Sequence, residues 1–160
     1  MIKVNLPVII LKGIILLPSS EIRLEFDNTE KQAVIDISEM FHDGNILIVN
    51  QKNHLEEEID TKDLPKIGII ARIVHKLELP NGKVRVIIKG IKRASIHEYL
   101  NSSSEITESI LSEINVPVLD VTEEKVIIRK LYNEVEKYIK SVPYISNSVL
   151  SQIINITNLS

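Results

Sequence analysis

The chain has no cysteine and no tryptophan among its 160 residues, and only 4% of its residues are aromatic. The absence of cysteine excludes disulfide bonds and thiolate metal sites, and it fits a reducing compartment, so we expect a cytoplasmic protein. With so few aromatic rings, the core must consist mainly of isoleucine, valine and leucine, and the β-branched members of this set favour strands. At 44% hydrophobic residues the chain can build such a core, which argues against extensive disorder.

A long uninterrupted hydrophobic segment is also missing. The opening MIKVNLPVIILKGIILLP is interrupted by Pro7, Lys12 and Gly13, is too short to cross a bilayer, and lacks a small-residue cleavage site. We therefore interpret it as two short buried strands, Leu6–Leu11 and Ile14–Leu17, and expect no membrane partner. The net charge of −3 argues against a dedicated nucleic-acid binder, which usually carries a basic face.

The motifs that would indicate an enzyme are absent from the sequence. A phosphate-binding loop needs a glycine five residues before its Gly-Lys pair and a serine or threonine after it, but position 77 is leucine and position 84 is valine around Gly82 and Lys83. The polar loop Gln51–Pro65 holds an acidic segment, Glu56–Asp63, whose carboxylates could form a metal site or an acid/base pair. Such a charge run is best explained as a solvated loop. The four histidines are dispersed without the spacing of metal ligands: His42, His54, His75 and His97. We therefore predict no catalytic, cofactor-binding or metal-binding residue in this chain.

Hydrophobic periodicity in the first part of the chain predicts strands and one helix. Glu21–Phe26 alternates between charged and apolar side chains, as a half-buried strand does. A helix then begins at a cap at Asn28 or Thr29 and ends at Gly44. Ile46–Val49 is entirely apolar, which predicts a strand buried on both faces. The helix is expected to bury a single apolar face, formed by Ala33, Val34, Ile37, Met40 and Phe41.

The most informative segment is IGIIARIVHKLELPNGKVRVIIKGIKRASI, residues 67–96. Its β-branched runs flank Pro80, Asn81 and Gly82. Asn-Gly between two such runs is a strong hairpin signal because both residues tolerate positive φ. We predict two long strands joined by a structural turn at these three residues, followed by a bulge or bend at Gly90 that leads into a third strand.

Basic residues concentrate in the same hairpin, and Ile87 interrupts the polar face of its second strand. Facing strands would gather these residues on one surface, where they would contact nucleic acid or an acidic partner. The alternative is a solvated face whose lysines and arginines prevent edge pairing. No aromatic residue in this segment offers a stacking platform, so we disfavour nucleic-acid binding. The basic cluster comprises Arg72, His75, Lys76, Lys83, Arg85, Lys89, Lys92 and Arg93.

The pattern becomes helical after a last predicted strand at residues 106–118. Asp120 or Thr122 caps a helix with an acidic first turn and a basic last turn, which match the helix macrodipole at both ends. Pro143 ends this helix, and a second short helix follows. The apolar stripe of the first helix consists of Ile128, Leu131, Val135, Tyr138, Ile139 and Val142.

The hairpin pattern IG-x-x-A-R-I, L-x-LP-N-G-x-V-x-V and G-x-x-R-A-x-I closely resembles the N-terminal domain of Lon-type ATP-dependent proteases. The resemblance covers nearly the whole chain. The opening LPVIILKGIILLP keeps the family's Pro7 and Pro18 but has Ile10 where proline is usual and Leu17 where an aromatic residue is usual. ILIVNQK resembles a strand of the family, and YNEVEKYIKSVPYISNSVL resembles its helical junction.

The resemblance implies an α+β fold. Residues 1–120 would form a β-rich, PUA-like pseudo-barrel that carries one helix, and residues 121–160 would form the beginning of an α-helical bundle. Glu30 and Lys31 match part of a family motif at the start of the first helix, which makes them candidate substrate-contact residues. The other interpretation is that they are ordinary residues of the first helical turn.

The resemblance also implies a parent machine in which this chain is the first part of a longer, hexameric protein. Downstream, an ATPase that needs ATP and Mg would unfold misfolded and regulatory proteins, and a protease with a Ser–Lys dyad would cleave them. The chain itself would be no enzyme, and its partners would be unfolded or damaged proteins and its own protomers. The alternatives are a free-standing Lon-domain binding protein without an ATPase and a PUA-like nucleic-acid-binding module.

Overall fold

The structure, a computed structural model, describes residues 2–27, 29–52, 62, 64–101, 107–146 and 148–154. The candidate cap Asn28, the acidic segment Glu56–Asp63 except Lys62, and His54 lie outside the described residues. The chain divides into two compact units, one that ends at Ile114 and one that begins at Asn115. The domain boundary at residue 120 stays a prediction.

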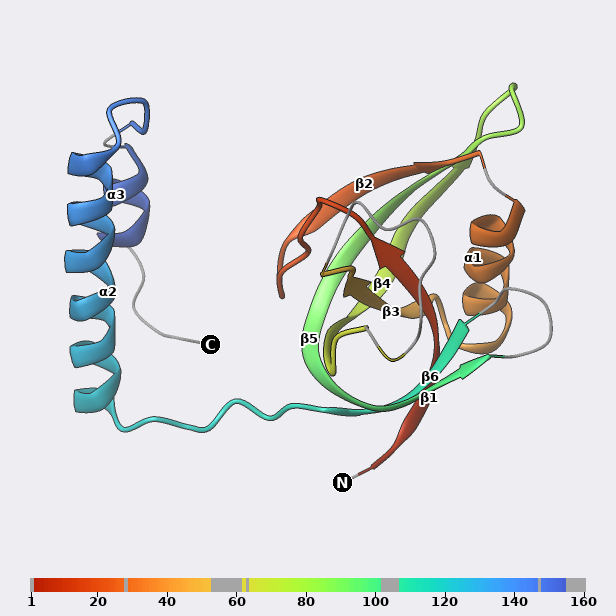
Figure 1. The fold of residues 1–160 in the computed structure, drawn as a ribbon, viewed down its shortest axis with the longest axis horizontal. Coiled ribbons are helices and arrows are strands. Elements are labelled where there is room, and N and C mark those ends of the chain that lie inside the picture. The colour runs from red at the N-terminus through yellow and green to blue at the C-terminus, as the bar shows by residue number, and fades with distance from the viewer. Residues whose placement is uncertain are drawn as a thin grey trace. The chain divides into compact units, whose positions relative to one another are not determined.

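Six strands of the first unit form one sheet that closes into a barrel (Figure 1). The sheet order is β2-β5-β4-β3-β1-β6, and β6 also pairs with β5, so five strands form a ring and β2 lies outside it, paired with β5. β1 and β3 are parallel, and the other pairs are antiparallel. This arrangement confirms the predicted α+β class. The strands are β1 Val4–Leu11, β2 Glu21–Phe26, β3 Asn45–Asn50, β4 Ile67–Glu78, β5 Val84–Asn101 and β6 Thr107–Glu113.

Strand β3 separates two apolar cores. Ile46 and Ile48 belong to the core that helix α1 covers, and Leu47 and Val49 belong to a second core built with β1, β5 and β6. All four side chains are at most 1% exposed, which confirms the prediction of a strand buried on both faces. Each such side chain contributes roughly 1.5–3 kcal/mol through burial, so β3 stabilises both cores at once.

Helix α1, Thr29–Phe41, lies beside the barrel (Figure 1) and buries Val34, Ile35 and Ser38. The predicted apolar face is partly wrong, because Met40 and Phe41 are 68% and 74% exposed. The buried face is rotated by about 100°, one residue, toward Ile35 and Ser38. A serine is tolerated there because its Oγ donates to the Ile35 carbonyl oxygen at 2.8 Å, so the buried hydroxyl of Ser38 has a partner.

Strands β4 and β5 form the hairpin, and β5 is one continuous strand where we predicted two. The pairing shifts register between Ile70, opposite Lys92, and Ala71, opposite Gly90, which leaves Ile91 as an extra residue in β5. Such a bulge bends its strand. The bend lets the first half of β5 pair with β2 and the second half pair with β6.

The second unit consists of two helices, α2 at Val121–Ser141 and α3 at Ser148–Ile154. Asp120 caps α2 as predicted, because its side chain accepts a hydrogen bond from the Thr122 N–H at 2.8 Å. Within the apolar stripe only Ile139 is fully buried, whereas Tyr138 is 57% exposed. The predicted strand at residues 106–118 is shorter than expected and ends at Glu113.

Candidate functional site

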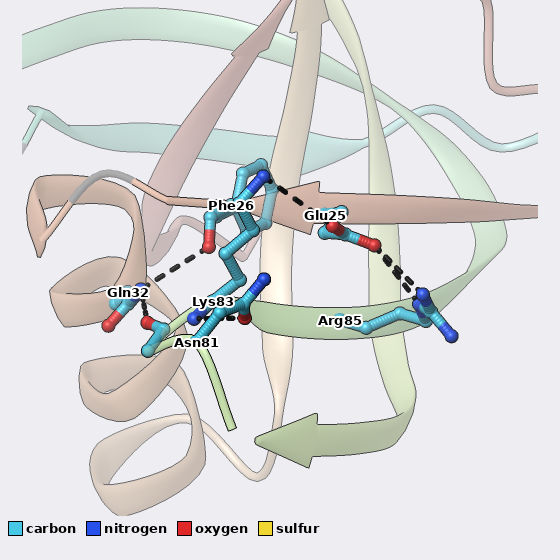
Figure 2. Close-up of polar contacts among 7 residues, drawn as sticks. Glu25, Phe26, Gln32, Asn81, Lys83 and Arg85 are labelled. Carbon is cyan, nitrogen blue, oxygen red and sulfur yellow. Dashed lines mark hydrogen bonds and ion pairs between the residues drawn. The ribbon is translucent and has the colours of Figure 1, made fainter. Parts of the chain in front are cut away.

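The predicted candidate residues belong to the start of α1 and to the turn of the hairpin. Figure 2 shows the corner of the barrel where these two elements meet the end of β2. Gln32 joins these three elements. Its Nε2 donates to the carbonyl oxygen of Phe26 at 3.3 Å and to that of Gly82 at 3.1 Å. The first turn of α1 is therefore fixed against the tip of the hairpin, and we call this region the hairpin corner.

Glu30 and Lys31 are both exposed in the first turn of α1. The Lys31 Nζ lies 5.6 Å from the centre of the Phe26 ring, a cation–π distance that holds the ammonium over the end of β2. The two residues therefore face solvent beside a partly fixed surface. Their role in substrate contact stays a prediction.

Pro80, Asn81 and Gly82 form the exposed tip of the hairpin. The Gly82 N–H donates to the Leu79 carbonyl oxygen at 3.0 Å, and the Leu79 N–H donates to the Lys83 carbonyl oxygen at 2.8 Å. Gly82 has φ of +78°, whereas the Asn81 φ is negative. The connection is thus a three-residue loop with one left-handed glycine, rather than a two-residue turn with two left-handed residues.

Four of the eight residues of the basic cluster form ion pairs with carboxylates from neighbouring elements. Lys76 on β4 contacts Asp36 and Glu39 of α1 at 2.6 and 3.2 Å, and its hydrogen bond to Asp36 is the main cause that raises the pKa of Lys76. The Arg85 guanidinium contacts Glu25 at 3.0 Å (Figure 2). Lys92 likewise contacts Glu113 at 2.8 Å. These carboxylates interrupt the basic surface that binding of nucleic acid would need.

The segment Lys12–Ser20, which we call the apolar loop, lies between β1 and β2 and is not a strand. The predicted strand Ile14–Leu17 is therefore wrong. Ile14, Ile15 and Leu17 are 44%, 70% and 60% exposed, whereas Leu16 between them is 2% exposed and belongs to the core that α1 covers. Three large apolar side chains thus face solvent within four consecutive residues.

The apolar loop is held to the barrel by hydrogen bonds of its backbone. The Ser19 N–H donates to the Gly90 carbonyl oxygen at 2.9 Å, and the Gly90 N–H donates to the Ser20 carbonyl oxygen at 2.9 Å. The Ser20 Oγ donates to the Leu17 carbonyl oxygen at 2.8 Å, and the Asn50 Nδ2 donates to that of Ile14. These bonds fix the loop although three of its side chains lie outside the core.

The sequence carries one signal that could have revealed this loop. Gly13 and Ser19 have φ of +73° and +66°, and each lies one residue inside an end of the apolar loop. Glycine and the Pro-Ser-Ser sequence after Leu17 are typical of loops. The unbroken apolar run Ile14–Leu17 between them, however, predicts a buried strand. Apolar composition alone does not distinguish a buried strand from an exposed apolar segment.

The fold defines a small α+β barrel domain followed by a helical segment. A model of the ATP-dependent protease La (LON) substrate-binding domain family matches residues 5–160, and the chain belongs to this family. The Lon protease of Buchnera aphidicola (strain Bp) is 31% identical over 157 residues, 98% of this chain. The Lon protease of Escherichia coli K12 is 30% identical over 151 residues, 94% of the chain. The chain spans 20% and 19% of the lengths of these two relatives.

Solved structures of Lon N-terminal domains share the fold. The N-terminal domain of the Mycobacterium avium complex Lon protease superposes with a TM-score of 0.69 at 19% identity, covering 96% of this chain and 76% of that one. The Lon N-terminal domain protein of Xanthomonas campestris gives a TM-score of 0.57 at 13% identity, covering 97% and 92%. These likenesses agree with the predicted β-rich barrel and the helices after it.

Within the described residues, no group of three or more histidine, aspartate or glutamate side chains is arranged to hold a metal ion. A helix long and apolar enough to span a bilayer is likewise absent from the parts of the chain that the structure describes.

Proposed function

We propose that this chain is the substrate-engaging domain of a Lon-type ATP-dependent protease, and that its apolar loop contacts apolar segments of unfolded polypeptides. The family is described as a substrate-binding domain, and the relatives are Lon proteases. The observation that carries the proposal is the exposure of Ile14, Ile15 and Leu17 on a backbone fixed by hydrogen bonds. Folded proteins hide apolar segments, so such a surface selects unfolded chains.

The parent protein supplies the chemistry in this proposal. ATP and Mg bind to a downstream ATPase, a Ser–Lys dyad cleaves the substrate, and the assembled protein is a cytoplasmic hexamer. A single apolar loop gives weak binding, micromolar or weaker, and several copies around one pore raise the apparent affinity through effective concentration. Reading the gene for a Walker A motif and a Ser–Lys protease domain separates this proposal from a free-standing binding protein.

The binding test uses the chain with a destabilised protein variant that stays unfolded and with the folded parent of that variant. We expect NMR shifts in the apolar loop with the unfolded polypeptide and none with the folded protein. Ile15→Ser combined with Leu17→Ser should abolish the shifts. Both side chains are at least 60% exposed, so the fold should not change.

A matched control removes equal apolar exposure elsewhere. Met40→Ser with Phe41→Ser changes two side chains that are 68% and 74% exposed at the end of α1, and it should leave binding intact. Equal shifts with folded and unfolded protein would contradict the proposal. If binding were lost only in the variant with Met40→Ser and Phe41→Ser, the substrate-binding surface would lie on α1 instead of the apolar loop.

A further inference from the structure

A groove lies on the outer surface of the sheet, where β2, β5 and β4 run side by side. It has a volume of about 360 Å³ and is lined by Arg23, His75, Lys76, Leu77, Arg85 and Ile87. The strand register explains this lining, because Arg23 and His75 both pair with Ile87, one from each side. In the next row Arg85 lies between Glu25 and Leu77. We call this feature the cationic groove.

The ionisable side chains that line the groove are all basic, although the net charge of the whole chain is −3. Its lining holds two arginines, a lysine and a histidine, and no carboxylate. Asp36 and Glu39 neutralise Lys76, and Glu25 at the rim contacts Arg85. The side chains of Arg23 and His75 have no hydrogen-bond or ion-pair partner within the described residues. An anionic ligand can therefore contact Arg23 and His75 without displacing another partner of these side chains.

The floor of the groove is apolar. Ile87 is half-buried between Arg23 and His75, and Leu77 is 55% exposed. Ile87 is the residue that interrupts the polar face of β5 in the sequence, and the structure places it at the centre of this groove. A volume of this size accommodates a large side chain, and small-molecule pockets begin at about 300 Å³. A purely anionic ligand would leave this apolar surface uncovered.

The geometry points to a second, charge-selective substrate site: the cationic groove binds polypeptide segments in which an apolar side chain is flanked by carboxylates. The apolar side chain packs on Leu77 and Ile87, and the carboxylates contact Arg23 and His75. This inference rests on the proposed function and names the class of substrate segment. Arg23 follows Ser20, the end of the apolar loop, by three residues of β2, or about 10 Å, so one extended polypeptide reaches both surfaces.

The test compares two fluorescein-labelled peptides of equal length that carry the same leucines and differ only in flanking glutamate or glutamine. Fluorescence anisotropy with the 160-residue chain should show about two- to fivefold tighter binding of the glutamate peptide, the range expected for exposed ion pairs. Added salt should reduce this preference. Arg23→Gln should bring the two affinities together without weakening the glutamine peptide. Leu77→Ser should weaken both peptides.

Arg129→Gln is the matched control, because it removes the same charge from an exposed position on α2 and should keep the preference. Equal affinities for the two peptides in the unmodified chain would overturn the inference and leave the proposed function standing. Binding of neither peptide would overturn both. A single-stranded DNA oligonucleotide of equal charge serves as a competitor. If it displaced the glutamate peptide, the groove would be a general anion site, which would contradict the role of an apolar side chain packed on Leu77 and Ile87.

Discussion

Replacement of Gly90 by alanine tests how the apolar loop is attached to the barrel. Gly90 lies in β5, where the chain passes directly over the backbone of Leu17. A Cβ atom at this position would lie 2.2 Å from the Leu17 carbonyl oxygen, 3.0 Å from its carbonyl carbon and 3.3 Å from Leu16 Cγ. The nearest atoms belong to backbone, so no side-chain rotation relieves the clash.

The cost follows from this geometry. An added Cβ would lie 2.2 Å from the Leu17 carbonyl oxygen, and real Cβ contacts stay above 3.0 Å, so the loop must move away by about 0.8 Å. That movement strains the two hydrogen bonds of Gly90 with Ser19 and Ser20 and pulls Leu16 outward from the core. Overpacking costs about 1–3 kcal/mol, and each hydrogen bond contributes about 1 kcal/mol. We expect Gly90→Ala to lower the free energy of unfolding by about 2–4 kcal/mol, or the Tm by roughly 8–16 °C.

Thermal unfolding followed by circular dichroism measures this difference, and Gly13→Ala is its control. Gly13 has φ of +73° but no atom within 4 Å of an added Cβ, so its substitution should cost only the backbone strain of about 1 kcal/mol. Gly90→Ala should also weaken binding of unfolded polypeptide because the loop moves. A Gly90→Ala protein as stable as Gly13→Ala would refute the reasoning.

Three further results are expected. Gly82→Val should lower the free energy of unfolding by about 1–3 kcal/mol through strain at φ of +78°, whereas Gly82→Asn should cost much less; equal melting temperatures for both would contradict a left-handed turn residue. Burial raises the pKa of Tyr99 from 10.0 to about 12, so the folded state holds this proton more tightly. Its stabilising contribution should be complete below pH 10 and be lost as the pH rises toward 12, and Tyr99→Phe should remove that part of the pH dependence of Tm. DNA should bind weakly at physiological salt. Tight, salt-sensitive binding that Lys89→Glu abolishes would show instead that the basic cluster binds nucleic acid.

The sequence predicted the strands and the hairpin well where local signals and tertiary packing agree. Ile46–Val49 is apolar at every position, and only a strand between two cores satisfies that pattern. Glu21–Phe26 alternates because one face of β2 lies on the core. Gly44 adopts φ of +73°, as a glycine after a helix often does.

The features that the sequence did not predict depend on tertiary packing. The face of α1 was predicted from apolar side chains alone, but Ser38 is buried because its hydroxyl finds a partner one turn back. The sequence predicted a bulge or bend at Gly90, but not that β5 stays one strand through it; pairing with β4 places the extra residue at Ile91. The cationic groove brings Arg23 and His75 together from strands 52 positions apart, and no local pattern predicts that register.

The apolar loop shows why exposure of apolar side chains can be stable here. Leu16 is the residue of this run that enters the core, whereas Ile14, Ile15 and Leu17 stay exposed. Hydrogen bonds to Gly90, Ser20 and Asn50 keep the backbone from rearranging to hide them. A surface that is already ordered loses little conformational entropy when a polypeptide binds, so more of the apolar contact energy appears as affinity. The same close approach at Gly90 therefore controls both the stability of the barrel and the readiness of the loop to bind, and substitutions there should change the two together.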